Sequence, residues 1–330
     1  MEKTIVLVGA KGFWSMRERV HNLLPPLVQL VYHEHLRLDC EDGRNVQALV
    51  VADQPIGPAV LDQYPGLKTI ARTGTGYDNI DLVETRKRGI VVTRVAQLNA
   101  EAVSEFTLGL IMELTKNISL HNQHMLEECW KRVESIRLCD LSVGVVGLGT
   151  VGRSLSLKLH HLGAKRILGW NHRLRPEVDA LCETSRLEYF TELEALLVQS
   201  DVLVLSVSLT TETRGLIGER ELSLMKPGAF LVNVCRGAVV NEEALARFVA
   251  EGRLGGVALD VFSAEPPASS PFSEPFMQSL LQSARAGRKV ILTPHTAGIT
   301  TRTVELISLQ VARNIAGALS GNLDGVEVVA

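Results

Sequence analysis

A glycine-rich motif in the middle of the chain constrains the fold more than any other feature. The apolar run Val143–Val146 leads into the sequence GLGTVG at 147–152, and helical periodicity follows it. A buried strand that ends at such a turn and opens a helix presents free backbone N–H groups to a pyrophosphate, whereas a bare glycine-rich turn needs neither element. Gly147 permits the turn, Gly149 lets the backbone approach the phosphates, and Gly152 lets the helix pack on the strand. The motif therefore predicts a dinucleotide-binding α/β domain.

Strand and helix signals alternate along the whole chain, which is the pattern of parallel α/β domains. A length of 330 residues suits two domains of ordinary size. The first helix is expected at 16–24. A long apolar helix at 100–117 separates two such series, and a helix at 302–319 follows the second. The strands that we expect lie at 4–8, 29–32, 46–52, 67–72 and 90–93, and then at 143–146, 166–170, 202–207, 230–234, 256–260 and 290–292. The sequence thus predicts the α/β class with two doubly wound parallel sheets.

Bulk composition excludes several classes of function. The formal net charge of −3 provides no electrostatic reason to expect nucleic acid as a partner. No apolar run approaches the roughly 20 residues of a membrane helix, and the first residues do not have the pattern of a signal peptide. The five cysteines are scattered without a CxxC pair, which argues against disulfides and a zinc site. We expect a cytoplasmic protein with no membrane partner and no bound metal.

The residues after the second strand of the domain that contains the glycine motif indicate whether NAD or NADP is bound. NAD-binding proteins place an Asp or Glu about 20 residues after the motif, where it binds the ribose 2′-hydroxyl. Here the strand at 166–170 runs into Asn171, His172 and Arg173, and no carboxylate occurs before Glu177. An amide can donate to a 2′-phosphate, and a guanidinium can pair with it. We expect NADP to be preferred; the alternative is that these are solvated loop residues and that NAD is also used.

Polar side chains also follow three later strands of this domain. Arg236 comes after the strand at 230–234, Asp260 and Glu265 after the next, and His295 after the last. In an open α/β sheet, ligands bind outside the carboxyl ends of the strands, so these side chains should meet at one edge. A single histidine after Thr-Pro is more often a loop residue than a catalyst. An arginine, a glutamate and a histidine together, beside a dinucleotide site, favour a catalytic centre.

Several motifs, in order along the chain, resemble those of the D-isomer-specific 2-hydroxyacid dehydrogenase family, which includes glyoxylate/hydroxypyruvate reductases, D-lactate dehydrogenases and 3-phosphoglycerate dehydrogenases. The resemblance covers nearly the whole chain. The matching segments are Arg72–Asp81, Asn99–Glu105, the glycine motif at 147–152, Ser208–Leu216, Cys235–Gly237, Asp260–Pro266 and Thr293–His295. The resemblance implies an enzyme that interconverts a 2-keto acid and a D-2-hydroxy acid by hydride transfer with NADP or NAD.

The resemblance also implies a role for each catalytic residue. His295 is expected to be the general acid in reduction and the base in oxidation, with Glu265 holding its imidazole and favouring the protonated form. Arg236 is expected to bind the substrate carboxylate and carbonyl and to polarise the C=O bond. The N–H groups of Thr75 and Gly76 are expected to bind the same carboxylate.

Further residues are implied to contact the cofactor. Asp260 is expected to accept a hydrogen bond from the nicotinamide carboxamide, the alternative being a simple turn or helix-capping residue. Cys235 stands where the family usually has Ala or Ser, and it is either a redox-sensitive thiol or, as we favour, a small buried filler. The expected cofactor contacts are Gly147, Gly149, Thr150, Val151, Gly152, Asn171, His172, Arg173, Ser208, Thr213, Cys235, Asp260 and His295.

Family members are usually homodimers of chains with two interleaved domains. The resemblance implies a flavodoxin-like substrate-binding domain at 1–99 and 297–330, into which a Rossmann coenzyme domain at 100–296 is inserted. It implies a homodimer formed through the coenzyme domain, to which the helix at 100–117 and the segment up to Leu141 contribute. The alternative function is a dinucleotide-sensing binding protein, because transcriptional corepressors of the family retain the same three catalytic residues. We expect no long disordered tails, which disfavours that alternative.

Overall fold

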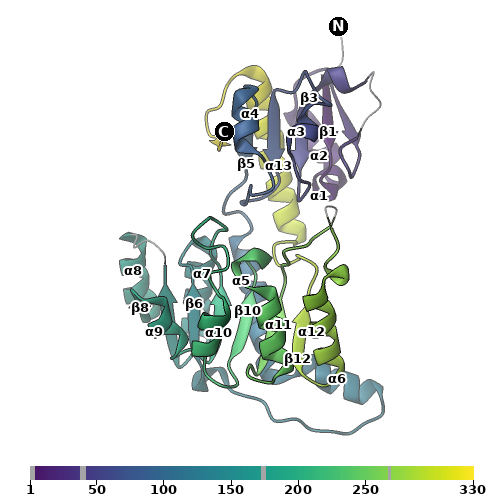
Figure 1. Ribbon diagram of the computed structural model, residues 1–330. Coiled ribbons are helices and arrows are strands. Elements are labelled where there is room, and N and C mark those ends of the chain that lie inside the picture. The colour runs from purple at the N-terminus through teal and green to yellow at the C-terminus, as the bar shows by residue number, and fades with distance from the viewer. Residues whose placement is uncertain (1–3, 38–41, 172–175, 267–268) are drawn as a thin grey trace. The chain divides into compact units, whose positions relative to one another are not determined.

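Figure 1 shows the computed structural model, which describes residues 4–37, 42–171, 176–266 and 269–330. The chain forms two compact units. Unit 1 comprises Met1–Asn99, Pro266–Ser269 and Ile299–Ala330, and unit 2 comprises Ala100–Glu265 and Ser270–Gly298. The chain thus leaves unit 1 after Asn99, builds unit 2, and returns to unit 1 for its last helix.

Unit 1 is built on a six-stranded sheet. Its strands are β1 (Thr4–Val8), β2 (Val28–Tyr32), β3 (Val46–Val51), β4 (Thr69–Arg72), β5 (Val91–Arg94) and β13 (Glu327–Val328). They lie in the order β13-β5-β4-β3-β1-β2; the first five strands of the chain are parallel, and β13 pairs antiparallel with β5. The order 2-1-3-4-5 of the parallel strands is that of flavodoxin-like folds.

Helices cover both faces of this sheet. They are α1 (Lys11–Ser15), α2 (Arg17–Val20), α3 (Pro58–Leu61), α4 (Leu82–Lys87) and α13 (Thr301–Ser320). Successive side chains of a strand point to opposite faces, so β1 contributes to two apolar clusters. Val6 and Val8 pack in the cluster that contains the apolar stripe of α13, and Ile5 and Leu7 pack in the cluster that contains Leu61 of α3.

Unit 2 is built on a seven-stranded sheet. Its strands are β6 (Ser142–Val146), β7 (Arg166–Trp170), β8 (Leu187–Phe190), β9 (Val202–Leu205), β10 (Phe230–Asn233), β11 (Gly256–Leu259) and β12 (Lys289–Leu292). All are parallel, in the order β12-β11-β10-β9-β6-β7-β8. This is the 3-2-1-4-5-6 order of the Rossmann fold with one further strand, and the strand order reverses between β6 and β9.

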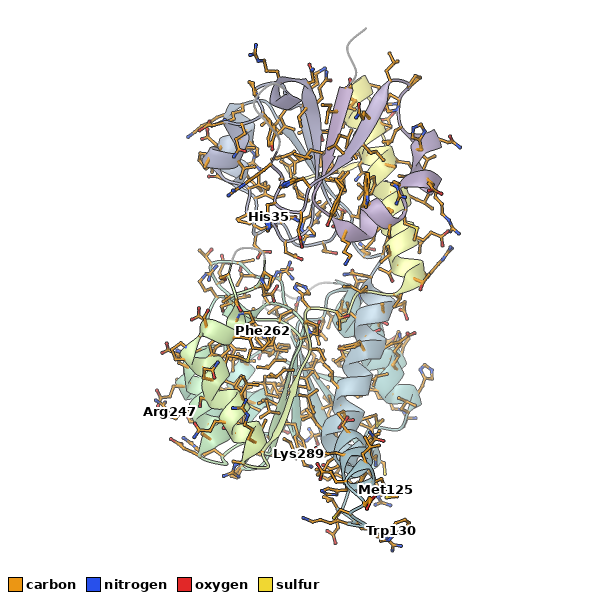
Figure 2. The ribbon with its side chains drawn as sticks, turned by 90° about the vertical axis from the view of Figure 1, so that its right-hand side faces the viewer. His35, Met125, Trp130, Arg247, Phe262 and Lys289 are labelled. Carbon is orange, nitrogen blue, oxygen red and sulfur yellow. The ribbon has the colours of Figure 1, made fainter. Side chains whose placement is uncertain are left out.

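The helices of unit 2 also lie on both faces of its sheet. They are α5 (Ala100–Lys116), α6 (Ile118–Leu126), α7 (Thr150–His161), α8 (Pro176–Ser185), α9 (Leu193–Leu197), α10 (Glu219–Leu224), α11 (Glu242–Ala250) and α12 (Pro275–Arg285). Val143 and Val145 of β6 pack in the cluster of α5, α7 and α8, and Val146 packs in that of α9 to α12. In Figure 2, Phe262, just after β11, and Lys289, at the start of β12, lie at opposite ends of this sheet.

The predicted fold class is confirmed, with local differences. The sequence predicts a first helix at 16–24, but the helical residues begin at Lys11 and are interrupted at Met16. It does not predict β8 or β13. Both are short edge strands, and β13 is exposed, so neither has the continuous apolar run that marks a buried strand. No helix in the described residues is long and apolar enough to cross a membrane.

Candidate active site

The glycine motif lies where the strand order of unit 2 reverses. Gly147 follows β6 and has φ +103°, a conformation that favours glycine. A Cβ atom there would lie 2.7 Å from the backbone of Ser206. A Cβ atom on Gly152 would lie 1.9 Å from the carbonyl oxygen of Gly147, so only glycine lets α7 begin this close to β6. A Cβ atom on Gly149 would meet no atom within 4 Å, so the turn is open on that side.

The start of α7 can therefore bind an anion. The N–H groups of the first helical turn have no partner within the helix, and in the described part of the chain no side chain caps this end. No acidic residue occupies the first turn, and the helix dipole favours negative charge there. Thr150 and Val151, two of the expected cofactor contacts, belong to this turn. The open turn and the uncapped helix fit the pyrophosphate of a dinucleotide.

Ser206 is a residue of this site that the sequence analysis does not assign. Its hydroxyl donates to the carbonyl oxygen of Gly147 at 2.7 Å, and its N–H donates to the carbonyl oxygen of Val146 at 2.8 Å. It therefore ties the end of β9 to the glycine turn. No local sequence pattern marks Ser206, because the residues that it binds lie 59 and 60 positions earlier in the chain.

Asn171 follows β7 beside the glycine turn. Its Oδ1 atom accepts the N–H of Leu148 at 3.3 Å, and its carbonyl oxygen accepts the hydroxyl of Tyr189 at 3.3 Å. The side chain is thus fixed at the edge where a Rossmann fold binds the adenine ribose. The other two residues expected there, His172 and Arg173, lie outside the described residues.

The loop after β9 contains the predicted cofactor residues Ser208 and Thr213. The Thr213 hydroxyl donates to the carbonyl oxygen of Ser208 at 2.6 Å and accepts the N–H of Thr210 at 2.8 Å. Because Thr213 is buried, its hydroxyl stabilises the loop conformation from inside. Any contact of Thr213 with a cofactor remains a prediction.

Cys235 and Arg236 form a turn after β10 that Asn233 holds. Asn233 Oδ1 accepts the N–H of Cys235 at 3.1 Å, and Asn233 Nδ2 donates to the carbonyl oxygen of Arg236 at 2.9 Å. Burial raises the pKa of the Cys235 thiol to about 11, so the thiol is neutral and poorly reactive near pH 7. Of the two interpretations of Cys235, this environment favours the small buried filler.

Arg236 is half-buried at the carboxyl end of β10, and its Nη1 atom donates to the carbonyl oxygen of Cys235 at 2.8 Å. The next residue, Gly237, lies directly against the loop that follows β11. A Cβ atom on Gly237 would lie 2.1 Å from the carbonyl carbon of Phe262. This close approach places the Arg236 turn beside the loop that carries Glu265.

His295 and Glu265 form a hydrogen-bonded pair. The distance from Nδ1 of His295 to Oε2 of Glu265 is 2.7 Å, and Oε1 of Glu265 accepts the N–H of Phe262 at 2.8 Å. Both side chains are half-buried. The carboxylate is thus fixed at both oxygens and in turn fixes the tilt and the tautomer of the imidazole. This is the geometry of a general acid–base histidine and its orienting carboxylate.

Asp260 organises the loop that carries His295. Its carboxylate is fully buried, with a relative exposure of 0%. Oδ1 accepts the Thr293 hydroxyl at 2.6 Å and the N–H of Thr296 at 2.9 Å, and Oδ2 accepts the N–H of Ala297 at 2.9 Å. These bonds hold His295 at φ +49°, an uncommon conformation for a residue with a side chain. The role of Asp260 toward nicotinamide remains a prediction.

A second carboxyl group, which the sequence analysis does not assign, lies beside the loop that carries Glu265. Oε1 of Glu242, in the first turn of α11, accepts the N–H of Ser263 at 2.9 Å. Burial raises the pKa of Glu242, and the nearby carboxylates of Glu265 and Glu274 raise it further. Two adjacent N–H groups of this loop, those of Phe262 and Ser263, are thus bound by two different carboxyl groups.

Thr75 and Gly76, the predicted substrate-binding residues, belong to unit 1 and follow β4 at its carboxyl end. Among the residues that the structure describes, neither of their N–H groups has an acceptor. Two adjacent N–H groups of this kind can bind a carboxylate.

The Rossmann sheet, the open glycine turn and the His295–Glu265 pair at the carboxyl ends of its strands are the features of a dinucleotide-dependent dehydrogenase. Residues 108–297 match the family model described as D-isomer specific 2-hydroxyacid dehydrogenase, NAD binding domain. The chain belongs to the D-isomer-specific 2-hydroxyacid dehydrogenase family, as its sequence motifs predict. It is an oxidoreductase that uses a nicotinamide dinucleotide.

Individual relatives agree with this assignment. The glyoxylate reductase of Thermofilum pendens is 33% identical over 282 residues, which cover 83% of this chain and 78% of that protein. The D-lactate dehydrogenase of Aquifex aeolicus, solved with NAD and lactic acid, has a TM-score of 0.86 at 25% identity, with 99% of each chain covered. The NADPH-dependent glyoxylate/hydroxypyruvate reductase of Sinorhizobium meliloti, solved with NADP and malonate, has a TM-score of 0.79 at 26% identity, covering 100% of this chain and 97% of that one. These relatives are enzymes, and none supports the alternative of a non-catalytic binding protein.

Proposed function

We propose that this enzyme reduces a small 2-keto acid to the D-2-hydroxy acid with NADPH, and that the same groups serve the reverse oxidation. His295 is the general acid, Glu265 orients its imidazole, and Arg236 binds the substrate carboxylate and carbonyl. The observation that carries this proposal is the 2.7 Å hydrogen bond between Nδ1 of His295 and Oε2 of Glu265. With Nδ1 bound to the carboxylate, the proton for the substrate comes from Nε2.

The remaining groups act on the charge that develops during reduction. When bound, the reduced nicotinamide supplies a hydride to the carbonyl carbon. As the carbonyl oxygen becomes an alkoxide, the guanidinium of Arg236 stabilises its negative charge, and His295 gives it a proton. The Glu265 carboxylate stabilises the imidazolium before this transfer. In oxidation His295 removes the proton from the hydroxyl group.

The N–H groups of Thr75 and Gly76, in unit 1, bind the substrate carboxylate in this proposal. Support comes from the two N–H groups that have no acceptor among the described residues, and from the match of Arg72–Asp81 to the family motif. In this proposal unit 1 is the substrate-binding domain and unit 2 is the coenzyme domain. The boundaries near Asn99 and Gly298 support that division.

NADP is the preferred cofactor in this proposal. The end of β7 has an amide, Asn171, where an NAD enzyme has a carboxylate, and Arg173 follows within two residues. An Asp or Glu at that place would repel a 2′-phosphate, which Asn171 does not. The Sinorhizobium meliloti relative was solved with NADP and the Aquifex aeolicus relative with NAD, so the fold accepts both cofactors.

A homodimer is proposed from an apolar surface on unit 2. We call residues 118–136 the apolar arm, because they carry six of the fifteen exposed large apolar side chains found among the described residues. These are Ile118, Leu120, Met125, Leu126, Trp130 and Ile136. Figure 2 shows Met125 and Trp130 at the end of unit 2, beyond its sheet. Exposed apolar side chains concentrated on one segment favour an interface there, and a second copy of the chain is the partner that the family implies.

The cysteines support a cytoplasmic location. Cys129 and Cys139 are exposed, Cys182 is partly buried, and Cys235 is buried. All four are free thiols in the described part of the chain. A reducing compartment keeps such thiols unpaired.

The proposal is tested by reduction of a panel of 2-keto acids with NADPH and with NADH. The panel contains glyoxylate, hydroxypyruvate, pyruvate and larger keto acids, and each rate is followed by loss of absorbance of the reduced nicotinamide. Chiral chromatography identifies the configuration of every product except glycolate, which is achiral. Turnover of at least one keto acid to the D product supports the proposal; an L product, or no turnover on any member, contradicts it.

A further inference from the structure

The loop formed by Gly74, Thr75 and Gly76 is held to the end of β5 through its carbonyl oxygens. The carbonyl oxygen of Gly74 accepts the N–H of Val95 at 3.3 Å. The carbonyl oxygen of Thr75 accepts Nη1 of Arg94 at 3.2 Å. Both carbonyl groups thus face β5, where they are bonded.

The direction of these carbonyl groups sets the direction of the N–H groups. In a planar trans peptide the C=O and N–H bonds point to opposite sides. The bond from Val95 therefore orients the N–H of Thr75, and the bond from Arg94 orients the N–H of Gly76. A backbone hydrogen bond provides the first of these constraints, but a single side chain provides the second.

Glu327 of β13 fixes the guanidinium of Arg94. Nε and Nη2 of Arg94 both donate to Oε1 of Glu327, the Nε bond at 2.6 Å. The two residues are paired in the antiparallel register of β5 and β13. The guanidinium carbon also lies 5.3 Å from the ring centre of Tyr77, the residue after the loop. Arg94 is thus bound on one edge by Glu327, while Nη1 reaches Thr75.

The planar guanidinium of Arg94 allows one side chain to bind both Glu327 and Thr75. A guanidinium is planar and can bind a carboxylate along one edge while donating elsewhere, whereas a lysine offers a point charge on a flexible stem. Glu327 also balances the charge of Arg94 beside the loop. The last residues are tied to the same strand, because the N–H of Val329 donates to the carbonyl oxygen of Val92 at 2.8 Å. In Figure 1 the C-terminus lies beside β5 and α4.

We propose that Arg94 and Glu327 are positioning residues for substrate binding, and that the C-terminal strand thereby forms part of the substrate-carboxylate site of unit 1. Arg94 aligns the N–H of Gly76 toward the carboxylate, and Glu327 aligns Arg94. This inference rests on the proposed function, in which Thr75 and Gly76 bind that carboxylate. Neither residue touches the reacting atoms, so both affect affinity more than the chemical step.

The test measures kcat and KM for the best 2-keto acid of the panel in Arg94→Gln and Glu327→Gln. We expect KM to rise about tenfold in Arg94→Gln and about threefold in Glu327→Gln, since an oriented hydrogen bond to an anion is weakened. We expect kcat to change by less than about threefold and the Kd for NADPH to stay unchanged. In Arg94→Lys, KM should stay close to its value in Arg94→Gln, because a lysine cannot bind Glu327 and Thr75 with one planar group.

Arg86→Gln is the matched control. Arg86 also binds the C-terminal segment, through Nη2 to the carbonyl oxygen of Val329 at 3.2 Å, and within the described residues this bond does not involve the loop. Its replacement should lower Tm and leave KM unchanged. An unchanged KM in both Arg94→Gln and Glu327→Gln, or an equal KM rise in Arg86→Gln, would overturn the inference. If Arg94→Gln does not fold, Glu327→Gln alone decides.

A second comparison separates this inference from the proposed function. Wild-type kcat/KM is measured for a keto acid and for the methyl ketone that lacks its carboxylate. Equal values would show that the carboxylate is not bound, and both the proposed role of Thr75 and Gly76 and the inference would fail. A strong preference for the keto acid, with unchanged KM in Arg94→Gln and Glu327→Gln, would overturn the inference alone.

Discussion

Nδ1 of His295 lies 2.7 Å from Oε2 of Glu265, whose other oxygen accepts the N–H of Phe262 at 2.8 Å. The loop that carries Glu265 therefore fixes the carboxylate independently of its bond to the histidine. A carboxylate fixed in this way stabilises the imidazolium form, because its negative charge stays beside the imidazole ring. The pair should thus set both the tautomer of His295 and the pH range of reduction.

Glu265→Gln should shift the pH profile of reduction. The reduction needs a protonated imidazole, so its rate falls with rising pH as His295 loses that proton. Removing the neighbouring anion destabilises the imidazolium, so the decline in kcat/KM should begin at lower pH than in wild type. The amide keeps the Phe262 contact, so the fold should persist. An unchanged pH profile would show that Glu265 does not stabilise the protonated form of His295.

Asp260→Asn should distinguish the two roles considered for Asp260. If the residue organises the His295 loop, the amide cannot accept all the bonds from Thr293, Thr296 and Ala297, and the free energy of unfolding should fall by about 2–3 kcal/mol. Thermal unfolding measures this loss, with Thr293→Val, which removes one bond, as a control expected to cost about 1 kcal/mol. A stable Asp260→Asn protein with a much higher Kd for NADPH would instead favour the role toward nicotinamide.

Asn171→Asp should move cofactor preference toward NADH. Aspartate retains the oxygen that accepts the N–H of Leu148, so the local structure should be kept. Its charge would repel a 2′-phosphate and bind a ribose 2′-hydroxyl. We expect the ratio of kcat/KM for NADPH over that for NADH to fall at least about tenfold, a difference of roughly 1.4 kcal/mol. A wild-type enzyme that already prefers NADH would contradict the premise.

Charge on the apolar arm should weaken the proposed dimer. Trp130→Glu and Leu126→Glu place carboxylates at two of the most exposed apolar positions, with relative exposures of 76% and 77%. The mass from light scattering should fall from that of a dimer to that of a monomer. Val83→Glu, at an exposed apolar position of unit 1, is the control and should leave the mass unchanged. A wild-type monomer, or variants that remain dimeric, would exclude this interface.

Local pattern and strand order explain how much of the site could be predicted. The glycine spacing at 147–152 requires a turn at φ > 0 and a close helix, and Gly147 and Gly152 meet those requirements. Glu265 and His295 follow strands of one parallel sheet, whose carboxyl ends share an edge, so their meeting was predictable. The two residues are 30 positions apart in sequence, and they meet because β11 and β12 are neighbouring strands.

The residues that the sequence did not assign depend on contacts that no local pattern encodes. Arg94 and Glu327 are 233 residues apart and meet only because a two-residue strand joins the edge of the unit 1 sheet. Asp260 reads as a ligand-facing carboxylate, yet its oxygens bind a loop more than 30 residues away. Glu242 reads as an ordinary first-turn acid of a helix, and only the packing of α11 brings it to Ser263.

The central claim is that His295 transfers the proton, and His295→Gln tests it most directly. Glutamine is close in size and can still bond Glu265, but it cannot act as an acid near pH 7. We predict that kcat for 2-keto acid reduction falls on the order of 10²–10⁴-fold, while the Kd for NADPH, measured by quenching of protein fluorescence, stays within about twofold of wild type. A variant that binds NADPH normally and retains near-wild-type kcat would contradict the account.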